Sequence, residues 1–135
     1  MKFKAVLFVC CLGLLPSAFA DNRHTHPQAN NDAKSGTKNV RNNCEIEIIN
    51  ESNTPVHVTG VFPDDGSSLI PFDIYPYSGP QYIDLYYYGY CHGGMYLYLH
   101  TFTGYRVHGG YTPVDTSIYL RPSYGRQLKA VIKAK

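Results

Sequence analysis

The chain has 135 residues, which is enough for one domain of ordinary size and too few for two. Its 12 Lys and Arg residues and 10 Asp and Glu residues give a formal net charge of +2, and two of the lysines, Lys2 and Lys4, stand at the extreme N-terminus. Without those two lysines the charges balance, so the composition gives no support to a nucleic-acid-binding function.

The first 20 residues are typical of a secretory signal peptide. Two lysines come first, the apolar run AVLFVCCLGLL follows, and PSAFA ends the segment at Ala20 with the small residues of a cleavage site. The apolar run is about a dozen residues long, whereas a membrane-spanning helix needs roughly 20. We therefore expect cleavage after Ala20, no transmembrane segment, and a secreted or periplasmic product. Acylation at Cys10 or Cys11 is the alternative, which would leave almost no hydrophobic region before the cysteine.

The next segment, residues 21–43, contains one large aliphatic residue, Val40, among many Asn, Lys, Ser and Gly. Such a segment buries too little apolar area to offset its ordering entropy, so we expect a flexible tail followed by a single domain over 44–135. His24 and His26 offer imidazoles that suit Cu or Zn, but two ligands on a mobile segment make a weak site. We therefore predict no metal site and no cofactor.

Two cysteines remain after signal-peptide removal, Cys44 and Cys91. A pair of cysteines in an exported protein predicts one disulfide, with two free thiols or a metal pair as alternatives. In the loop-entropy treatment, a bridge between Cys44 and Cys91 constrains the unfolded chain by about 4 kcal/mol.

From Cys44 onward, short apolar alternations are separated by turn residues, which predicts antiparallel β-structure. The even spacing of the turns favours an all-β sandwich or small barrel of about seven or eight short strands. Glycine-containing turns are expected at 92–94, 109–110 and 123–125. The expected strands are 44–50, 55–62, 69–76, 81–91, 95–104, 105–109, 116–122 and 126–134.

Side-chain parity then sorts the residues of these strands between two faces. Cys44 shares a face with aliphatic residues of its strand, and Cys91 shares one with Ile83, Leu85 and Tyr87. If CHGGM connects 81–91 to 95–104 as a hairpin, the opposite parity forms one aromatic face. We predict this face as the binding site, made by Tyr82, Asp84, Tyr86, Tyr88, Tyr96, Tyr98 and His100.

Two interpretations of the aromatic face remain open. The rings either pack beneath a second sheet as structural filling, or part of the face is exposed and binds a ligand, since Tyr offers large contact area at low entropic cost. A glycan or a protein partner would fit, although the absence of Trp counts against a glycan. Catalysis is the less favoured function, because no Gly-x-Ser-x-Gly elbow is present. A small hydrolase would require a pocket with His57 or His100 beside a carboxylate.

The stretches CEIEIIN and IDLYYYGYC, preceded by a signal peptide, resemble small exported β-rich proteins of Gram-negative bacteria that live inside other cells, some of which leave through type II secretion. The resemblance covers the domain after residue 43 and implies an effector or periplasmic binding role with no catalytic residues. We therefore expect a secreted non-catalytic binding module for a host protein or glycan, with a structural envelope or matrix protein as the alternative. The oligomeric state is left open.

Overall fold

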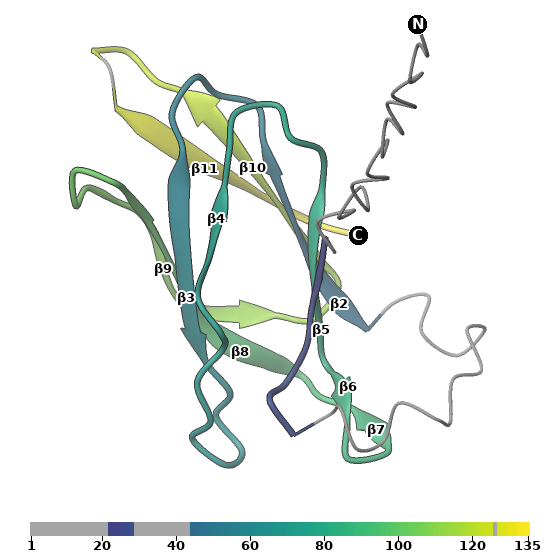
Figure 1. The fold of residues 1–135 in the computed structure, drawn as a ribbon. Helices are drawn as coiled ribbons and strands as arrows, with labels where there is room; N and C mark the ends of the chain where they lie inside the picture. The colour runs from purple at the N-terminus through teal and green to yellow at the C-terminus, as the bar shows by residue number, and fades with distance from the viewer. Residues whose placement is uncertain (1–21, 29–43, 126) are drawn as a thin grey trace, which may run out of the picture.

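The computed structural model describes residues 22–28, 44–125 and 127–135, and these form an all-β protein (Figure 1). The predicted signal peptide lies outside the described residues. The predicted fold class is confirmed, with eleven strands in the described part of the chain. The strands are β1 Arg23–His24, β2 Glu45–Asn50, β3 Val56–Val61, β4 Phe72–Ile74, β5 Gln81–Asp84, β6 Tyr86–Tyr87, β7 Tyr90–Cys91, β8 Gly94–Thr101, β9 Arg106–Pro113, β10 Thr116–Pro122 and β11 Leu128–Ala134.

Two larger sheets and one short hairpin contain these strands. The five-stranded sheet has the order β1-β5-β2-β10-β11, the four-stranded sheet has the order β4-β3-β8-β9, and β6 pairs with β7. All pairs in the four-stranded sheet are antiparallel. In the five-stranded sheet, β1 pairs with β5 and β2 with β10 in parallel, which the expectation of purely antiparallel pairing did not include. Parallel neighbours are possible here because each pair is joined through long intervening chain rather than a tight turn.

One core fills the space between the two larger sheets. Along β2 and β3 every second side chain is buried, as strand geometry requires when one face packs inward and the other meets solvent. Burying each large aliphatic side chain contributes about 1.5–3 kcal/mol. The fully buried members from the four central strands are Ile46, Ile48, Val56, Val58, Met95, Leu97, Leu99, Ile118 and Leu120.

The segment 81–91 does not form the single strand that its tyrosines predicted. The Asp84 carboxylate accepts a hydrogen bond from the Tyr86 amide at 2.9 Å, an Asx turn that ends β5. Tyr88 and Gly89 then take positive φ angles of 53° and 81° and turn the chain back between β6 and β7. Two successive residues at positive φ are the signature of the type I′ hairpin turn, which Gly89 makes possible.

Consequently the predicted hairpin through 92–94 is wrong. β5 lies in the five-stranded sheet and β8 in the four-stranded sheet, so the 92–94 segment carries the chain from one sheet to the other. Gly109 and Gly110 are not a turn either, because β9 continues through both. The chain turns instead near Gly104, whose amide donates to the Thr101 carbonyl at 2.9 Å.

The described part of the predicted flexible tail, 22–28, is packed against the domain. β1 pairs with the edge of β5, the His24 ring stacks on Phe72 with centroids 3.4 Å apart, and His26 is fully buried. Composition underestimated this segment because its histidine rings supply stacking area that an aliphatic count omits. Residues 29–43 lie outside the described part.

The predicted disulfide between Cys44 and Cys91 is confirmed, with the Cα atoms 5.8 Å apart. Cys44 is buried as expected, whereas Cys91 is exposed because the hairpin turn breaks the parity that linked it to Ile83 and Leu85. The described residues contain no helix long and apolar enough to cross a membrane.

Candidate functional site

The predicted binding residues fall into separate parts of the molecule. Tyr96, Tyr98 and His100 lie on β8, at alternate positions that point away from the core. The other four do not join them: Tyr82 and Asp84 lie on β5, and Tyr86 and Tyr88 lie in the β6–β7 hairpin. The single aromatic face predicted from the sequence is therefore wrong, and only its β8 part is a shared surface.

The four predicted residues away from β8 have contacts within the protein. Arg23 lies over the Tyr82 ring, and Asp84 is mostly buried in its Asx turn. The Tyr86 hydroxyl donates to the Gly89 carbonyl at 3.0 Å, inside its own hairpin. The Tyr88 hydroxyl donates to the Asp65 carboxylate at 3.0 Å.

On β8 the exposed side chains belong to a larger surface that we call the outer aromatic face. It covers the solvent side of the four-stranded sheet, and its members are Tyr75, Tyr96, Tyr98, His100, Phe102 and Tyr111. Tyr96 pairs in register with Tyr111 on β9, and their rings meet edge-on with centroids 5.7 Å apart. At the other end of β8, the Tyr75 and Phe102 rings also meet edge-on, at 6.4 Å.

A glycine gives Tyr98 its place on this face. Tyr98 is opposite Gly109 on β9, and a Cβ atom built there would stand 3.2 Å from Tyr98 Cδ1 and 2.9 Å from Arg106 Cδ. The absence of a side chain at Gly109 lets the Tyr98 ring and the Arg106 stem lie across the strand. The glycine that suggested a turn in the sequence is thus a packing position within a strand.

A recess of about 420 Å³ opens at the Phe102 end of the outer aromatic face. His57 Nδ1 lies 2.6 Å from Asp73 Oδ1 and donates to it, since an ionised carboxylate only accepts. In the neutral ring this leaves His57 Nε2 as an acceptor. His57 pairs in register with Asp73 on one side and His100 on the other. The recess is lined by His57, Asp73, His100, Thr101, Phe102 and Gly104.

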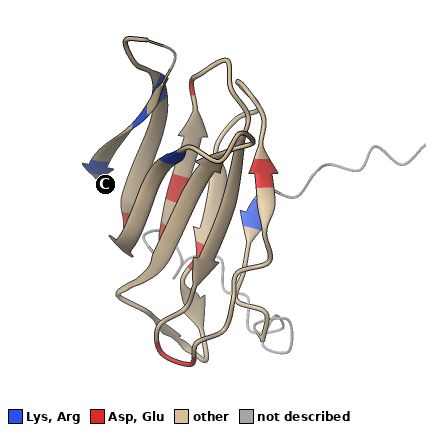
Figure 2. Cartoon of the chain, turned by 90° about the vertical axis from the view of Figure 1, so that its left-hand side faces the viewer, with Lys and Arg blue, Asp and Glu red and all other residues tan. Residues whose placement is uncertain are grey.

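Charged residues are scarce on the strands beneath this face. β3 and β8 carry no Lys, Arg, Asp or Glu, β4 carries one Asp, and β9 begins with one Arg. Figure 2 shows Lys and Arg instead along β11, the strand that ends at the C-terminus. The C-terminal residue Lys135 contacts Glu45 and Glu47 of β2 at 3.2 and 3.0 Å. The charges therefore pair mostly on the five-stranded sheet.

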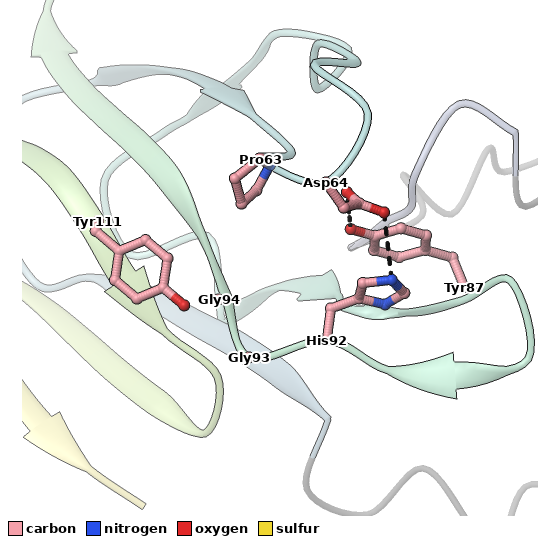
Figure 3. Close-up of a pocket in the computed structure, with 7 residues that line it drawn as sticks. All are labelled: Pro63, Asp64, Tyr87, His92, Gly93, Gly94 and Tyr111. Carbon is pink, nitrogen blue, oxygen red and sulfur yellow. Dashed lines mark hydrogen bonds and ion pairs between the residues drawn. The ribbon is translucent and has the colours of Figure 1, made fainter.

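A second region, which we call the end cluster, lies where the loop after β3 meets the β6–β7 hairpin (Figures 1 and 3). Its residues are His26, Asp64, Asp65, Tyr87, Tyr88 and His92. Tyr87 is only 2% exposed, and its hydroxyl donates to Asp64 Oδ1 at 2.7 Å. Its ring stacks with His92 at 3.6 Å and with His26 at 4.2 Å. Burial, reinforced by Asp64, raises the pKa of the Tyr87 phenol well above its ordinary value.

The His26 side of the end cluster is a closed hydrogen-bond network. The Gln28 amide donates to His26 Nδ1 at 3.1 Å, so the ring proton sits on Nε2 and is donated to Asp65 Oδ2 at 2.9 Å. A hydrogen bond from the backbone amide of Ser67, with further help from Tyr88, lowers the Asp65 pKa to about 2. Ligand atoms of His26, Asp64 and Asp65 lie within 4.8 Å of one another. A metal on His26 Nε2 would nevertheless have to displace the proton that this network requires.

The paired histidines of the N-terminal segment do not share a ligand position either. His24 Nε2 donates to Gln81 Oε1 at 2.9 Å, while His26 is engaged with Asp65. Their contacts are made with different strands and loops.

Comparison with known proteins found no family model that matches the chain, no similar curated protein and no similar solved structure. The site is therefore defined by its geometry. Sequence reasoning missed Tyr75 and Tyr111 as members of the outer aromatic face, and it missed the pairing of His57 with Asp73. Strand parity does put Phe102 on the same face as Tyr96, Tyr98 and His100, although Phe102 was not among the predicted binding residues. The alternation YRVHGGYTP could have placed Tyr111 beside Tyr96 if the glycines had been assigned to the strand.

Proposed function

We propose that the chain is a non-catalytic binding module that holds a glycan at the outer aromatic face, in the recess beside Phe102. The observation that carries the proposal is an exposed ring next to a cross-strand row of hydrogen-bonding groups. Phe102 is 56% exposed, and the row runs from Asp73 through His57 to His100. The electron-rich face of an aromatic ring attracts the slightly positive C–H groups of a sugar, while carboxylate and imidazole groups bind its hydroxyls.

The lining of the recess supports binding more than hydrolysis. The recess does meet the condition stated above for a small hydrolase, because His57 stands beside the carboxylate of Asp73, with His100 on the other side of His57. Glycoside hydrolysis normally uses two carboxylates, and the described lining holds one. The hydroxyl of Thr101 bonds to Thr103 Oγ1 at 2.9 Å and accepts from the Tyr105 amide at 3.1 Å. It is therefore occupied rather than poised as a nucleophile.

A protein partner is the second candidate, and the Tyr96–Tyr111 pair favours it. These rings are 43% and 51% exposed, and they extend the uncharged surface away from the recess toward the opposite end of β8. Exposed tyrosines of this kind are enriched at protein interfaces, where they supply contact area at low entropic cost. In either case we propose that the ligand is met outside the cytoplasm, on a host cell or in the periplasm. The disulfide is compatible with such a compartment.

The two candidates are separable with variants at the two ends of the outer aromatic face. A glycan array should be probed with the chain starting at residue 21 and with its Phe102→Ala and Asp73→Asn variants. A pull-down from host lysate should use the same chain and a Tyr96→Ala/Tyr111→Ala double variant. Tyr124→Ala is the matched control, since Tyr124 is fully exposed in the loop between β10 and β11.

A glycan ligand predicts that Phe102→Ala and Asp73→Asn abolish array binding while the Tyr124 variant retains it. A protein ligand predicts that the double variant loses the captured partner and the recess variants keep it. Each variant should unfold within about 1 kcal/mol of the parent, the range of a single cross-strand pair on an exposed face. If every variant binds the glycan array and captures host proteins as the parent does, a binding role for this face is contradicted and the structural envelope alternative is favoured.

A further inference from the structure

His92, on the other side of Tyr87 from the closed network, has one ring nitrogen without a hydrogen bond. Its side chain is 8% exposed, and Nε2 is buried with no hydrogen-bond partner among the described residues. Nδ1 lies 3.2 Å from the Leu85 carbonyl oxygen, which can only accept, so the proton is on Nδ1. When the ring is neutral, Nε2 therefore presents a lone pair to its surroundings. A buried polar atom in that state is costly unless something binds to it.

The nearest polar atom to that lone pair is a carboxylate oxygen. Asp64 Oδ2 lies 3.3 Å from His92 Nε2, without the geometry of a hydrogen bond (Figure 3). The contact is an ion pair when Nε2 carries a second ring proton, whereas with a neutral ring the two electron-rich atoms repel unless a metal cation lies between them. In a tetrahedral zinc site, with bonds of about 2.0–2.1 Å to N and O, two ligand atoms stand about 3.3–3.4 Å apart. The observed separation equals one edge of that tetrahedron.

We propose that His92 Nε2 and Asp64 Oδ2 bind a zinc-like divalent cation at the mouth of the pocket drawn in Figure 3. A nitrogen and an oxygen ligand suit zinc, and its remaining positions face a pocket of about 280 Å³ that leaves room for water or a ligand group. The pocket is lined by Pro63, Asp64, Tyr87, His92, Gly93, Gly94 and Tyr111.

Both ligands are held in place by outer contacts of the kind that metal ligands need. The Leu85 carbonyl fixes the tautomer and tilt of His92, as backbone carbonyls commonly do for zinc-binding histidines. The Tyr87 hydroxyl fixes the other oxygen of Asp64, and Tyr87 also stacks on the His92 ring. The Tyr87 hydroxyl donates its proton to Asp64 Oδ1, so Tyr87 orients the carboxylate without ligating the metal itself. With two protein ligands, the site should bind zinc reversibly and more weakly than a closed structural site.

The test uses the tag-free chain from residue 21, stripped with EDTA and titrated with zinc chloride by calorimetry at pH 7.5. His92→Gln and Asp64→Asn should each weaken binding by about tenfold or more, since even outer-sphere changes cost 10–100-fold. His57→Gln is the matched control, because His57 also stands beside an aspartate and lies on the outer aromatic face. It should bind zinc like the parent.

Nitrogen NMR of the parent protein keeps the inference testable if a variant misfolds. Without metal, His92 should show a protonated Nδ1 and an unprotonated Nε2, and zinc should shift the Nε2 resonance. Three results would overturn the inference: no zinc binding at millimolar metal, equal binding by the His92 and His57 variants, or an Nε2 that carries a proton and pairs with Asp64 as a plain ion pair.

Discussion

The outer aromatic face and the end cluster use the same residue type in opposite ways. In the end cluster, each phenol is tied to its own carboxylate, Tyr87 to Asp64 and Tyr88 to Asp65. The Tyr87 ring also has imidazoles stacked on it. On the outer aromatic face, Tyr96 and Tyr111 meet only edge-on and remain about half exposed. The first region fixes the hydroxyls of its tyrosines on carboxylates, even though the Tyr88 ring is 46% exposed, whereas the second region presents its rings to solvent.

The difference teaches that backbone conformation, not composition, decides what a tyrosine does. Tyr86, Tyr87 and Tyr88 are consecutive, yet their side chains are half-buried, buried and exposed in turn. A tight turn brings neighbouring rings against the loop after β3, where Asp64 and Asp65 receive their hydroxyls. A regular strand such as β8 instead sends every second ring outward.

Removal of the disulfide beside the end cluster should have the largest effect on stability. Replacing both cysteines, Cys44→Ala/Cys91→Ala, should lower the free energy of unfolding by about 4 kcal/mol, because the bond closes a long loop in the unfolded chain. Chemical denaturation measures the change. Parent protein denatured in reducing buffer is the control and should match the double variant. A loss below about 1 kcal/mol would show that the end cluster holds the hairpin without the bond.

Truncating one tyrosine in each region should have the next largest effect and should distinguish the two regions by the stability that is lost. Tyr87→Ala should destabilise the protein by about 3 kcal/mol or more, as expected for a large buried ring. Tyr96→Ala should cost less than about 1 kcal/mol, the range of a cross-strand pair. Thermal unfolding of both variants makes the comparison. Similar losses from the two substitutions would mean that the outer aromatic face is structural as well.

Local alternation made much of this fold predictable. The strands β2, β3 and β10 lie within a residue of the predicted ranges, and the inward positions of Ile46, Val56 and Ile118 follow from parity. The disulfide followed from counting the cysteines that remain after the predicted signal peptide. These features depend on short stretches of sequence, so one sequence contains enough information to find them.

The pairing of strands and the composition of the site were not predictable in the same way. The break at Tyr88 and Gly89 depends on a turn type that tyrosine rarely enters, so a run of alternating residues concealed it. The partners His57 and Asp73 come from strands joined only in the folded sheet. The N-terminal segment packs on rings far along the chain, His24 on Phe72 and His26 on Tyr87. Such contacts are set by topology, which composition does not record.

Adjacent glycines between the two regions give a smaller, sharper test. A Cβ at Gly94 would stand 2.5 Å from the Thr112 carbonyl oxygen and 2.7 Å from Tyr111 Cζ, so Gly94→Ala should cost about 1–3 kcal/mol and shift the Tyr111 ring. At Gly93 the closest such atom is Tyr111 Oη at 3.5 Å, an ordinary contact. Gly93→Ala is therefore the control and should change stability by less than about 0.5 kcal/mol. Equal losses would place the constraint in the backbone rather than in the Tyr111 packing.

The smallest effect is expected behind the outer aromatic face, at His108 on β9. Burial lowers the pKa of His108 below its ordinary value of 6.5. The His108 ring is therefore protonated less readily in the folded protein than in the unfolded chain. Stability from this histidine is fully present above pH 6.5 and is lost as the pH falls through the lower folded pKa. His108→Gln, which keeps a polar group near Thr112, should flatten the decline in unfolding free energy between pH 7 and pH 5. Denaturation at several pH values measures the slope, and NMR titration of the parent His108 checks the direction. An unchanged slope in the variant would mean that burial does not shift the pKa of His108, and that His108 is better solvated on β9 than its packing behind the exposed tyrosines implies.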